Sequence, residues 1–306
     1  MNEAKLPDGV IVFERGWLSA NNILFVGNGS TALVDSGYCT HATQTVDLVT
    51  ATLGEKPLDL LLNTHLHSDH CGGNAALQAL FPDLQTFIPP GQAKSVSPWD
   101  PDALTYLPTG QLCPAFGFDK VLLPGNDMEL GDTIWETYAA PGHDPYSLIF
   151  FEPRSKTLIS ADALWEKGFG VVFPELEGAT AFDEVSATFD LIERLSPKTV
   201  IPGHGPVFNY RKEVLVNARQ RLDAFVKNPS RHAHYAAKVL LKFKLLERQQ
   251  LPEIELSNWA RATPYFRAIH EKFFLSVPTD QWIEKLIDEL ASSGAAQRRG
   301  MMVLNS

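Results

Sequence analysis

The chain contains little cysteine and no long apolar run, and both absences restrict what it can be. Only three cysteines occur among 306 residues, at Cys39, Cys71 and Cys113, with no C-x-x-C spacing. An odd count of scattered cysteines argues against a disulfide scaffold and fits a reducing compartment. No window approaches the roughly 20 apolar residues of a membrane helix, and the first residues lack the basic start and apolar stretch of a signal peptide. We therefore expect a cytoplasmic protein without a membrane partner.

Length, composition and charge predict two domains. Hydrophobic residues make up 44% and charged residues 20% of the chain, which is typical of a globular protein with a substantial core. A length of 306 residues exceeds what one average core needs. Residues 1–210 hold 10 Lys and Arg against 26 Asp and Glu, a net charge of −16, whereas residues 211–306 hold 16 against 10, a net charge of +6. We place one domain over residues 1–210 and a second over residues 211–306.

Hydrophobic periodicity predicts alternating strands and helices before residue 210 and mainly helices after it. Strands are expected at 10–13, 23–26, 31–34, 58–62, 121–123, 134–139, 147–151, 157–159 and 199–201. Helices are expected at 40–53, 74–80, 182–195, 214–227, 233–249 and 279–293. The proline-rich stretch 89–114 follows neither period, so we interpret it as an irregular excursion that overhangs a site.

Four potential metal ligands lie close together directly after the strand predicted at 58–62. The segment reads NTHLHSDHCGG from residue 63 to residue 73. If the chain stays extended here, His65, His67 and Asp69 point to one side, and a turn at His70 brings a fourth ligand alongside. Imidazole and carboxylate both suit zinc, and without a cation these buried groups would need other partners. The cluster therefore indicates a metal site, with Cys71 interpreted as a packing residue rather than a ligand.

The segment around His65 resembles the H-x-H-x-D-H signature of the metallo-β-lactamase superfamily, and later motifs follow in that family's order. APGH ending at His143 is similar to its histidine-bearing turn, SAD ending at Asp162 to its metal-bridging aspartate, and PGHG around His204 to its last histidine. VDSG around Asp35 is similar to the early aspartate that hydrogen-bonds to a ligand. The resemblance implies an α+β fold, the αββα four-layer sandwich, followed by a mainly helical C-terminal extension.

The resemblance also implies a site that holds two metal ions. By it, one metal would be held by His65, His67 and His143, the other by Asp69, His70 and His204, with Asp162 bridging. We assign the carboxylates Asp69 and Asp162 to catalysis, and two Zn²⁺ as cofactors, with Fe or Mn as alternatives. Two cations would lower the pKa of a shared water from about 15.7 toward neutrality and supply hydroxide, while polarising the scissile carbonyl or phosphoryl oxygen. The expected enzyme is a hydrolase.

The residues at individual positions indicate which branches of the superfamily the chain resembles. His67 stands where the flavin-linked di-iron reductases carry an acidic residue, and Asp162 stands where true β-lactamases usually lack aspartate. The full ligand set instead resembles glyoxalase II, the lactonases and the phosphodiesterase branch, and iron-dependent persulfide dioxygenases share much of it. Asp144 follows His143 where glyoxalase II commonly has threonine, which weakens a glutathione-thioester assignment. Four aromatic residues could line the substrate pocket: Tyr146, Trp165, Phe169 and Phe173. The alternative for Tyr146 is an aromatic residue at a strand start, and for the other three a place in the core.

The basic C-terminal region raises alternatives to a small-molecule substrate. A helix through Leu290, the pair Arg298-Arg299 and the strand-like segment 301–304 resemble the end of a winged-helix module, as in lactamase-β-2 proteins that act on single-stranded RNA. A solvated amphipathic face is the other interpretation of these charges. A third alternative is a non-enzymatic effector that holds a ligand or a partner. We predict a small ester, thioester or lactone, because a net charge of −16 discourages a polyanion. The oligomeric state stays open, with a homodimer as one option.

Overall fold

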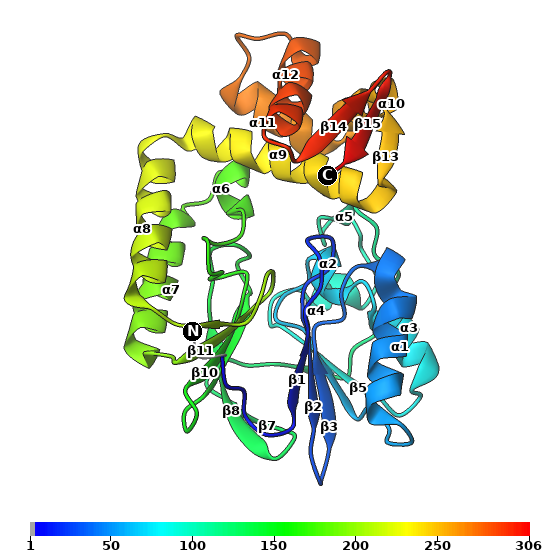
Figure 1. Cartoon of the computed structure of the whole chain (residues 1–306), viewed down its shortest axis with the longest axis vertical. Helices are drawn as coiled ribbons and strands as arrows, with labels where there is room; N and C mark the ends of the chain where they lie inside the picture. The colour runs from blue at the N-terminus through cyan, green and yellow to red at the C-terminus, as the bar shows by residue number, and fades with distance from the viewer. Residues whose placement is uncertain (1–3) are drawn as a thin grey trace. The chain divides into compact units, whose positions relative to one another are not determined.

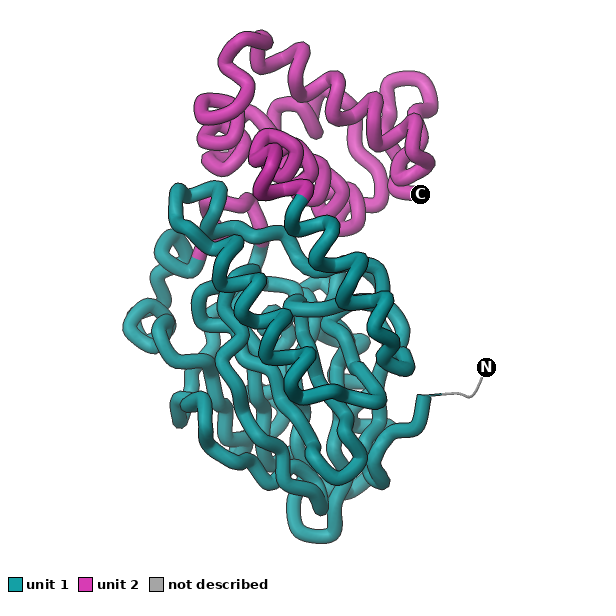
Figure 2. The backbone as a smooth tube through the Cα atoms, turned by 90° about the vertical axis from the view of Figure 1, so that its left-hand side faces the viewer, with its two compact units in different colours: residues 1–104, 112–223 teal, residues 105–111, 224–306 magenta. Residues whose placement is uncertain are grey.

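A computed structural model describes residues 4–306 and divides the chain into two compact units (Figure 2). Unit 1 comprises the chain up to residue 104 together with 112–223, and unit 2 comprises 105–111 together with 224–306. The division falls inside helix α8 (Lys212–Lys227), whereas the sequence analysis placed a boundary at residue 210. The short segment 105–111 belongs to unit 2, although in sequence it lies between the two parts of unit 1.

Unit 1 is built on two six-stranded sheets that lie face to face (Figure 1). The first sheet runs in chain order: β1 (Val10–Phe13), β2 (Asn22–Val26), β3 (Thr31–Val34), β4 (Leu60–Leu62), β5 (Gln85–Ile88) and β6 (Lys120–Val121). The second runs in reverse order: β12 (Phe208–Asn209), β11 (Thr199–Pro202), β10 (Thr157–Ala161), β9 (Leu148–Glu152), β8 (Thr133–Ala139) and β7 (Asp127–Leu130). Strands β3 to β6 pair in parallel, as do β10 and β11, and the other neighbours are antiparallel.

The central strands are buried on both faces, which requires a helical layer outside each sheet. In β2, Ile23 and Phe25 belong to the core between the sheets, where the Phe25 ring lies edge-on to Trp135 with centroids 5.4 Å apart. Leu24 between them points the other way and packs in a cluster with Val49 and Leu77. This alternation follows from the two-residue period of a strand.

Helices cover the outer faces of both sheets and complete the four layers (Figure 1). Helices α1 (Ala42–Leu53) and α3 (Asn74–Leu80) lie outside the first sheet, and α7 (Phe182–Leu195) and α8 lie outside the second. Shorter helices are η1 (Cys39–His41), α2 (Ser68–Cys71), α4 (Ala93–Val96) and α6 (Phe173–Glu177). The αββα sandwich predicted from the sequence is confirmed.

Unit 2 combines helices with a small antiparallel sheet. Its elements are α5 (Tyr106–Thr109), α9 (Pro229–Arg248), β13 (Gln250–Pro252), α10 (Glu253–Ala262), α11 (Pro264–Phe273), α12 (Thr279–Ser292), β14 (Ala296–Arg299) and β15 (Met302–Asn305). The strand order is β13-β15-β14. Leu240, Phe266, Trp282 and Leu286 are all at most 2% exposed and form part of its core. None of the helices in residues 4–306 combines the length and apolarity that crossing a bilayer requires.

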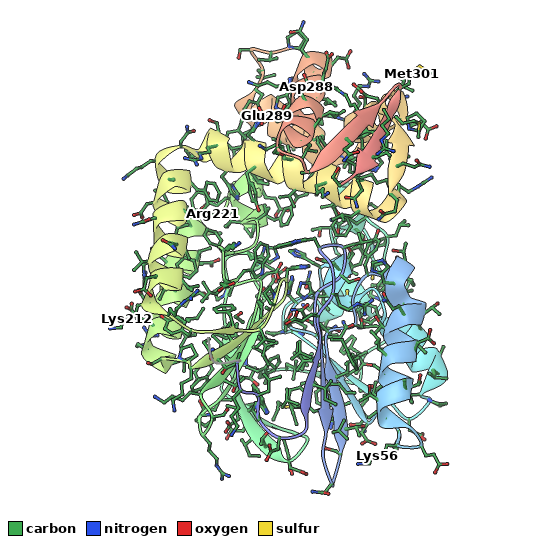
Figure 3. The ribbon with its side chains drawn as sticks, viewed as in Figure 1. Lys56, Lys212, Arg221, Asp288, Glu289 and Met301 are labelled. Atoms are coloured by element: carbon green, nitrogen blue, oxygen red, sulfur yellow. The ribbon has the colours of Figure 1, made fainter. Side chains whose placement is uncertain are left out.

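Several basic side chains on the surface of unit 2 pair with acidic ones. Arg298 forms a bidentate pair with Glu253, with nitrogen–oxygen distances of 2.8 and 2.7 Å, and also contacts Asp288. Glu289 accepts from Lys238 at 3.0 Å. Figure 3 labels Asp288 and Glu289 on α12, and Met301 in the turn between β14 and β15. Helix α12 therefore carries acidic groups beside Arg298, an arginine that the sequence analysis singled out.

Candidate metal centre

The histidine motif leaves the end of β4 and enters a single helical turn. His67 is the residue before α2, with an extended backbone at φ −68° and ψ 148°. His67 therefore lies on extended chain, as expected, whereas His65 lies in a bend and Asp69 within the turn, and neither is on an extended segment. The turn forms because His67 O accepts from His70 N at 2.9 Å. This turn orients Asp69 and His70 toward residues of the second sheet.

One group of potential ligands consists of three imidazoles. Nε2 of His65 lies 3.1 Å from Nδ1 of His67, and His143 completes the group, with all three ligand atoms within 4.8 Å of one another. His143 comes from the loop between β8 and β9. Its Nδ1 donates to the carbonyl oxygen of Val171 at 2.5 Å, so Nε2 is the nitrogen left to face the group.

A second group combines one carboxylate with two imidazoles. Oδ2 of Asp69 lies 3.1 Å from Nε2 of His204, and His70 completes the group within 4.8 Å. His204 follows β11, so this group joins the first sheet to the second. His70 is held from behind by Asp35, whose Oδ2 lies 2.7 Å from Nδ1 of His70.

Asp162, at the end of β10, lies between the two groups. Its Oδ1 is 3.4 Å from Nε2 of His70 and 3.8 Å from Nε2 of His204. Its Oδ2 is 3.3 Å from Nε2 of His143. His65, His70 and Asp162 also form a group of their own whose ligand atoms lie within 4.8 Å. The two oxygens of one carboxylate therefore face different sets of histidines.

The protonation of these groups fits a divalent cation. Burial lowers the pKa of His65, of His143, and of His67 to about 3, so these imidazoles are neutral and offer lone pairs. Burial also opposes ionisation of Asp162, but the neighbouring His204 and His70 hold its pKa well below the usual range. Nε2 of His70 and Nε2 of His143 are buried with no hydrogen-bond partner among the described residues. Buried nitrogen and anionic oxygen donors of this kind are the ligands that zinc and other transition metals take.

Asp35 connects the first strands to the ligand motif. It is 1% exposed, and its Oδ1 accepts from Thr64 N at 2.9 Å while its Oδ2 accepts from Thr64 Oγ1 at 2.8 Å and contacts His70 Nδ1. Its backbone has φ of +60°, a conformation in which aspartate and asparagine are among the tolerated residues. One carboxylate therefore orients a ligand imidazole and the residue that precedes His65.

Two residues beside the cluster were not singled out as site residues from the sequence. Asp144 is 4% exposed, its Oδ2 lies 3.8 Å from Nε2 of His67, and burial raises its pKa to about 6. Its position directly after His143 is the signal that could have found it. Asn21 donates from its backbone to Gly203 O at 2.7 Å and thereby holds the turn that carries His204. No local pattern marks Asn21, because its partner lies about 180 residues away in the sequence.

The four aromatic residues proposed for the pocket lie in different environments. The indole N–H of Trp165 donates to Asp162 Oδ1 at 3.2 Å, and the Phe173 ring centroid lies 5.3 Å from that of His67. Tyr146 is 40% exposed and packs so closely on Gly91 that a Cβ there would lie 2.2 Å from its ring. Phe169 takes the second of its two alternatives: it is 1% exposed and packs in the core against Phe189, with Arg221 of α8 (labelled in Figure 3) 5.5 Å above its ring.

The chain thus combines an αββα sandwich with a cluster of histidines and aspartates that could hold metal ions where the two sheets meet. Residues 15–204 match the family described as the metallo-beta-lactamase superfamily, and the chain belongs to that superfamily. The match spans the early loop before β2, the histidine motif and the last ligand histidine.

Individual relatives are distant. A hydroxyacylglutathione hydrolase from Thermosynechococcus vestitus is 24% identical over 179 residues, which cover 58% of this chain and 59% of that protein. The chain therefore spans about three fifths of the length of that relative. A metallo-beta-lactamase family protein from Thermus thermophilus, TTHA1429, shares the fold over 99% of this chain and 100% of its own, at 19% identity and a TM-score of 0.57. TTHA1623, solved in a di-iron-bound form, covers 69% of this chain and 98% of its own at 24% identity and a TM-score of 0.52.

Proposed function

We propose that the chain is a dinuclear metal-dependent hydrolase of a small carboxylic ester, thioester or lactone. The observation that carries this proposal is the position of Asp162, whose Oδ2 lies 3.3 Å from His143 while Oδ1 lies 3.4 Å from His70. A carboxylate with one oxygen toward each of two histidine groups is suited to bridge two cations. Zn²⁺ is the cofactor we propose, with Fe or Mn as alternatives, and the di-iron form of TTHA1623 supports keeping iron among them.

The proposed ligand set divides into two groups that share Asp162. His65, His67 and His143 would hold one cation, and Asp69, His70 and His204 the other. When bound, two such cations lower the pKa of water and polarise a carbonyl oxygen. The residues of the chain contribute by fixing this geometry: Asp35 orients His70, Val171 O orients His143, and the Trp165 N–H holds Asp162. With this arrangement, hydrolysis needs no serine or cysteine nucleophile.

Charge supports an acyl substrate over RNA. Residues 1–210 carry a net charge of −16, which discourages a polyanion even after two divalent cations offset part of it. Arg298, one of the two arginines singled out for the RNA alternative, is engaged by Glu253 and Asp288. The name of the relative from T. vestitus, a hydrolase of hydroxyacylglutathione, supports a thioester among the substrates. Asp144 stands where glyoxalase II commonly has threonine. This difference favours a thioester other than that of glutathione, an ester or a lactone.

The test begins with protein stripped by a chelator and reloaded separately with Zn²⁺, Fe²⁺ or Mn²⁺. Each form is assayed on a panel of thioesters, lactones and aryl esters and on single-stranded RNA at physiological salt. We expect two metals per chain, acyl hydrolysis that chelation abolishes, and no efficient RNA cleavage. If RNA is cleaved, Arg298→Ala with Arg299→Ala weakens that cleavage, and all acyl compounds are inert, the phosphodiesterase alternative replaces the proposal. If two metals bind and nothing is hydrolysed, the non-enzymatic effector alternative replaces it.

A further inference from the structure

An exposed tryptophan lies beside the metal ligands on the loop between β1 and β2. Trp17 is 55% exposed, although its neighbours Leu18, Ser19 and Ala20 are at most 3% exposed. A single exposed apolar side chain needs no explanation by itself. Trp17 differs because its ring is arranged against residues of the proposed metal site.

The ring of Trp17 lies parallel to a ligand imidazole and against a second indole. Its centroid is 5.4 Å from that of His204 with an interplanar angle of 12°, and 5.2 Å from that of Trp165 with an angle of 73°. Trp165 in turn lies 5.5 Å from His204 at 85° and donates to Asp162 Oδ1 at 3.2 Å. We call Trp17 and Trp165 the indole corner. It stands on the side of the site that carries His204.

The loop that carries Trp17 is fixed at its C-terminal end to the loops that carry Asp69 and His204. Ala20 N donates to Asp69 O at 2.9 Å, and Asn21 N donates to Gly203 O at 2.7 Å. The Asn21 side chain adds bonds of 3.0 Å to Pro202 O and 2.8 Å to Gly205 O.

Arg15 holds the N-terminal end of the same loop through hydrogen bonds. Its N–H donates to Asn21 Oδ1 at 2.8 Å, and its guanidinium donates to Asn22 Oδ1 at 2.6 Å and Thr45 Oγ1 at 2.9 Å. Trp17 is therefore held at a set place beside the ligands and does not have to be ordered when a ligand binds. An ordered, uncovered indole has little conformational entropy left to lose on binding.

We propose that the indole corner is an aryl-binding subsite, so that the natural substrate carries a planar aromatic group next to its scissile carbonyl. This rests on the proposed function. Indole rings favour offset or edge contacts with another aromatic ring, and these contacts add to the affinity gained from the area that they bury. A saturated ring of the same size buries similar area but lacks this geometry. The corner should therefore discriminate a phenyl group from a cyclohexyl group.

The first experiment measures binding without turnover. Acetate, phenylacetate and cyclohexylacetate are titrated into metal-loaded protein by calorimetry, because each offers a carboxylate to the metals and they differ only in the ring. Wild type should bind phenylacetate more tightly than cyclohexylacetate. Trp17→Leu, which keeps apolar bulk but loses the flat ring, should weaken phenylacetate binding about tenfold and leave acetate binding and the metal content unchanged. Leu123→Ala, at a residue 51% exposed after β6, is the matched control for losing exposed apolar surface and should change nothing.

Two further variants keep the proposal testable if Trp17→Leu folds poorly. Trp17→Phe retains an aromatic ring and should retain most of the preference. Asn21→Ala keeps the Trp17 side chain but removes the side-chain bonds to Arg15 N, Pro202 O and Gly205 O, and should reduce the preference for phenylacetate; its metal content is measured as well, because the same bonds hold the turn of His204. If wild type binds both ring compounds equally, or if Trp17→Leu weakens acetate as much as phenylacetate or lowers metal content, Trp17 supports His204 and the subsite is refuted.

The second experiment identifies which side of the ester carries the ring. Phenyl groups are placed on the acyl side in one ester series and on the leaving alcohol in another. Trp17→Leu should raise KM for one series and leave kcat within a factor of two. A phenylacetate preference in protein that hydrolyses no ester would leave the subsite standing and refute the hydrolase proposal, so the two failures are distinguishable.

Discussion

Asp35 Oδ2 lies 2.7 Å from Nδ1 of His70 and 2.8 Å from Oγ1 of Thr64, so one buried carboxylate fixes two points of the ligand motif. Because Nδ1 of His70 is engaged by Asp35, its Nε2 is the nitrogen that faces Asp162. The negative charge of Asp35 also increases the basicity of the imidazole that would bind metal.

Asp35→Asn should lower metal affinity by about 10 to 100-fold. Asparagine tolerates the φ of +60° at this position, so the loss would come from the charge and not from backbone strain. Competition with a chelator measures the affinity, and circular dichroism checks the fold. Asp83→Asn, at an exposed carboxylate, is the matched control. An unchanged affinity in Asp35→Asn would contradict the orienting role.

Removing the proposed bridge and removing a single ligand should have different effects. Asp162→Ala should reduce the occupancy of both metals, because its two oxygens face His143 on one side and His70 on the other. His204→Ala should chiefly empty one position, since His204 belongs to one group. Metal per chain is measured by elemental analysis after gel filtration. Equal loss in both variants would count against bridging.

Asp144 should support one metal position and not the other. Its Oδ2 lies 3.8 Å from Nε2 of His67, and its Oδ1 accepts from Tyr146 N at 2.8 Å. Asp144→Ala should weaken the binding of one of two metals by about tenfold, the lower end of the range for residues that orient a ligand. Asp144→Asn retains an acceptor for Tyr146 N–H and separates the loss of the turn from the loss of charge. Full two-metal affinity in Asp144→Ala would refute this role.

The predicted bounds of strands and helices were most accurate where the hydrophobic period of a strand or a helix ran through the whole element. The ranges 10–13, 31–34, 74–80 and 182–195 coincide with β1, β3, α3 and α7. Strand β5, which is as short as β1 and β3, was missed because QTFI lies between prolines and its identity as a strand depends on pairing with β4. In stretch 89–114, expected to be irregular, two single-turn helices occur, α4 and α5.

Part of the site could likewise be predicted from local sequence patterns, whereas the rest depends on contacts that only the folded chain brings together. Each ligand motif has a local pattern of histidine, aspartate and glycine, so all seven positions could be proposed from the sequence. Which nitrogen faces the cluster depends on partners such as Val171 O for His143, which no local pattern contains. Trp17 was missed because its neighbour His204 is brought beside it only by the meeting of two sheets.

The last prediction concerns how the metal-free protein responds to acid. Burial lowers the pKa of His65, His67 and His143, with His67 at about 3 against an ordinary value of 6.5. Below pH 6.5 the unfolded chain therefore binds protons that the folded chain does not, and His67 alone costs about 1.4 kcal/mol per pH unit in this range. His70 acts in the opposite direction: burial opposes its protonation, but Asp35 and Asp162 raise its pKa, so it is protonated first in the folded state.

The three histidines with a lowered pKa therefore give a loss of stability as the pH falls from 6.5 toward 5.5, because the contribution from the raised pKa of His70 changes only above pH 6.5 and the raised pKa of Asp144, at about 6, opposes the loss only below that pH. Urea unfolding of chelator-treated protein at pH 7.5, 6.5 and 5.5 measures the free energy of unfolding, and His67→Asn should show a shallower decline because one of the three is gone. Loaded metal should raise stability at pH 7.5 and lose that effect in acid, since protons compete for the imidazoles. A stability that is flat or rises between pH 6.5 and 5.5 in metal-free protein would mean that these imidazoles are not held neutral by burial.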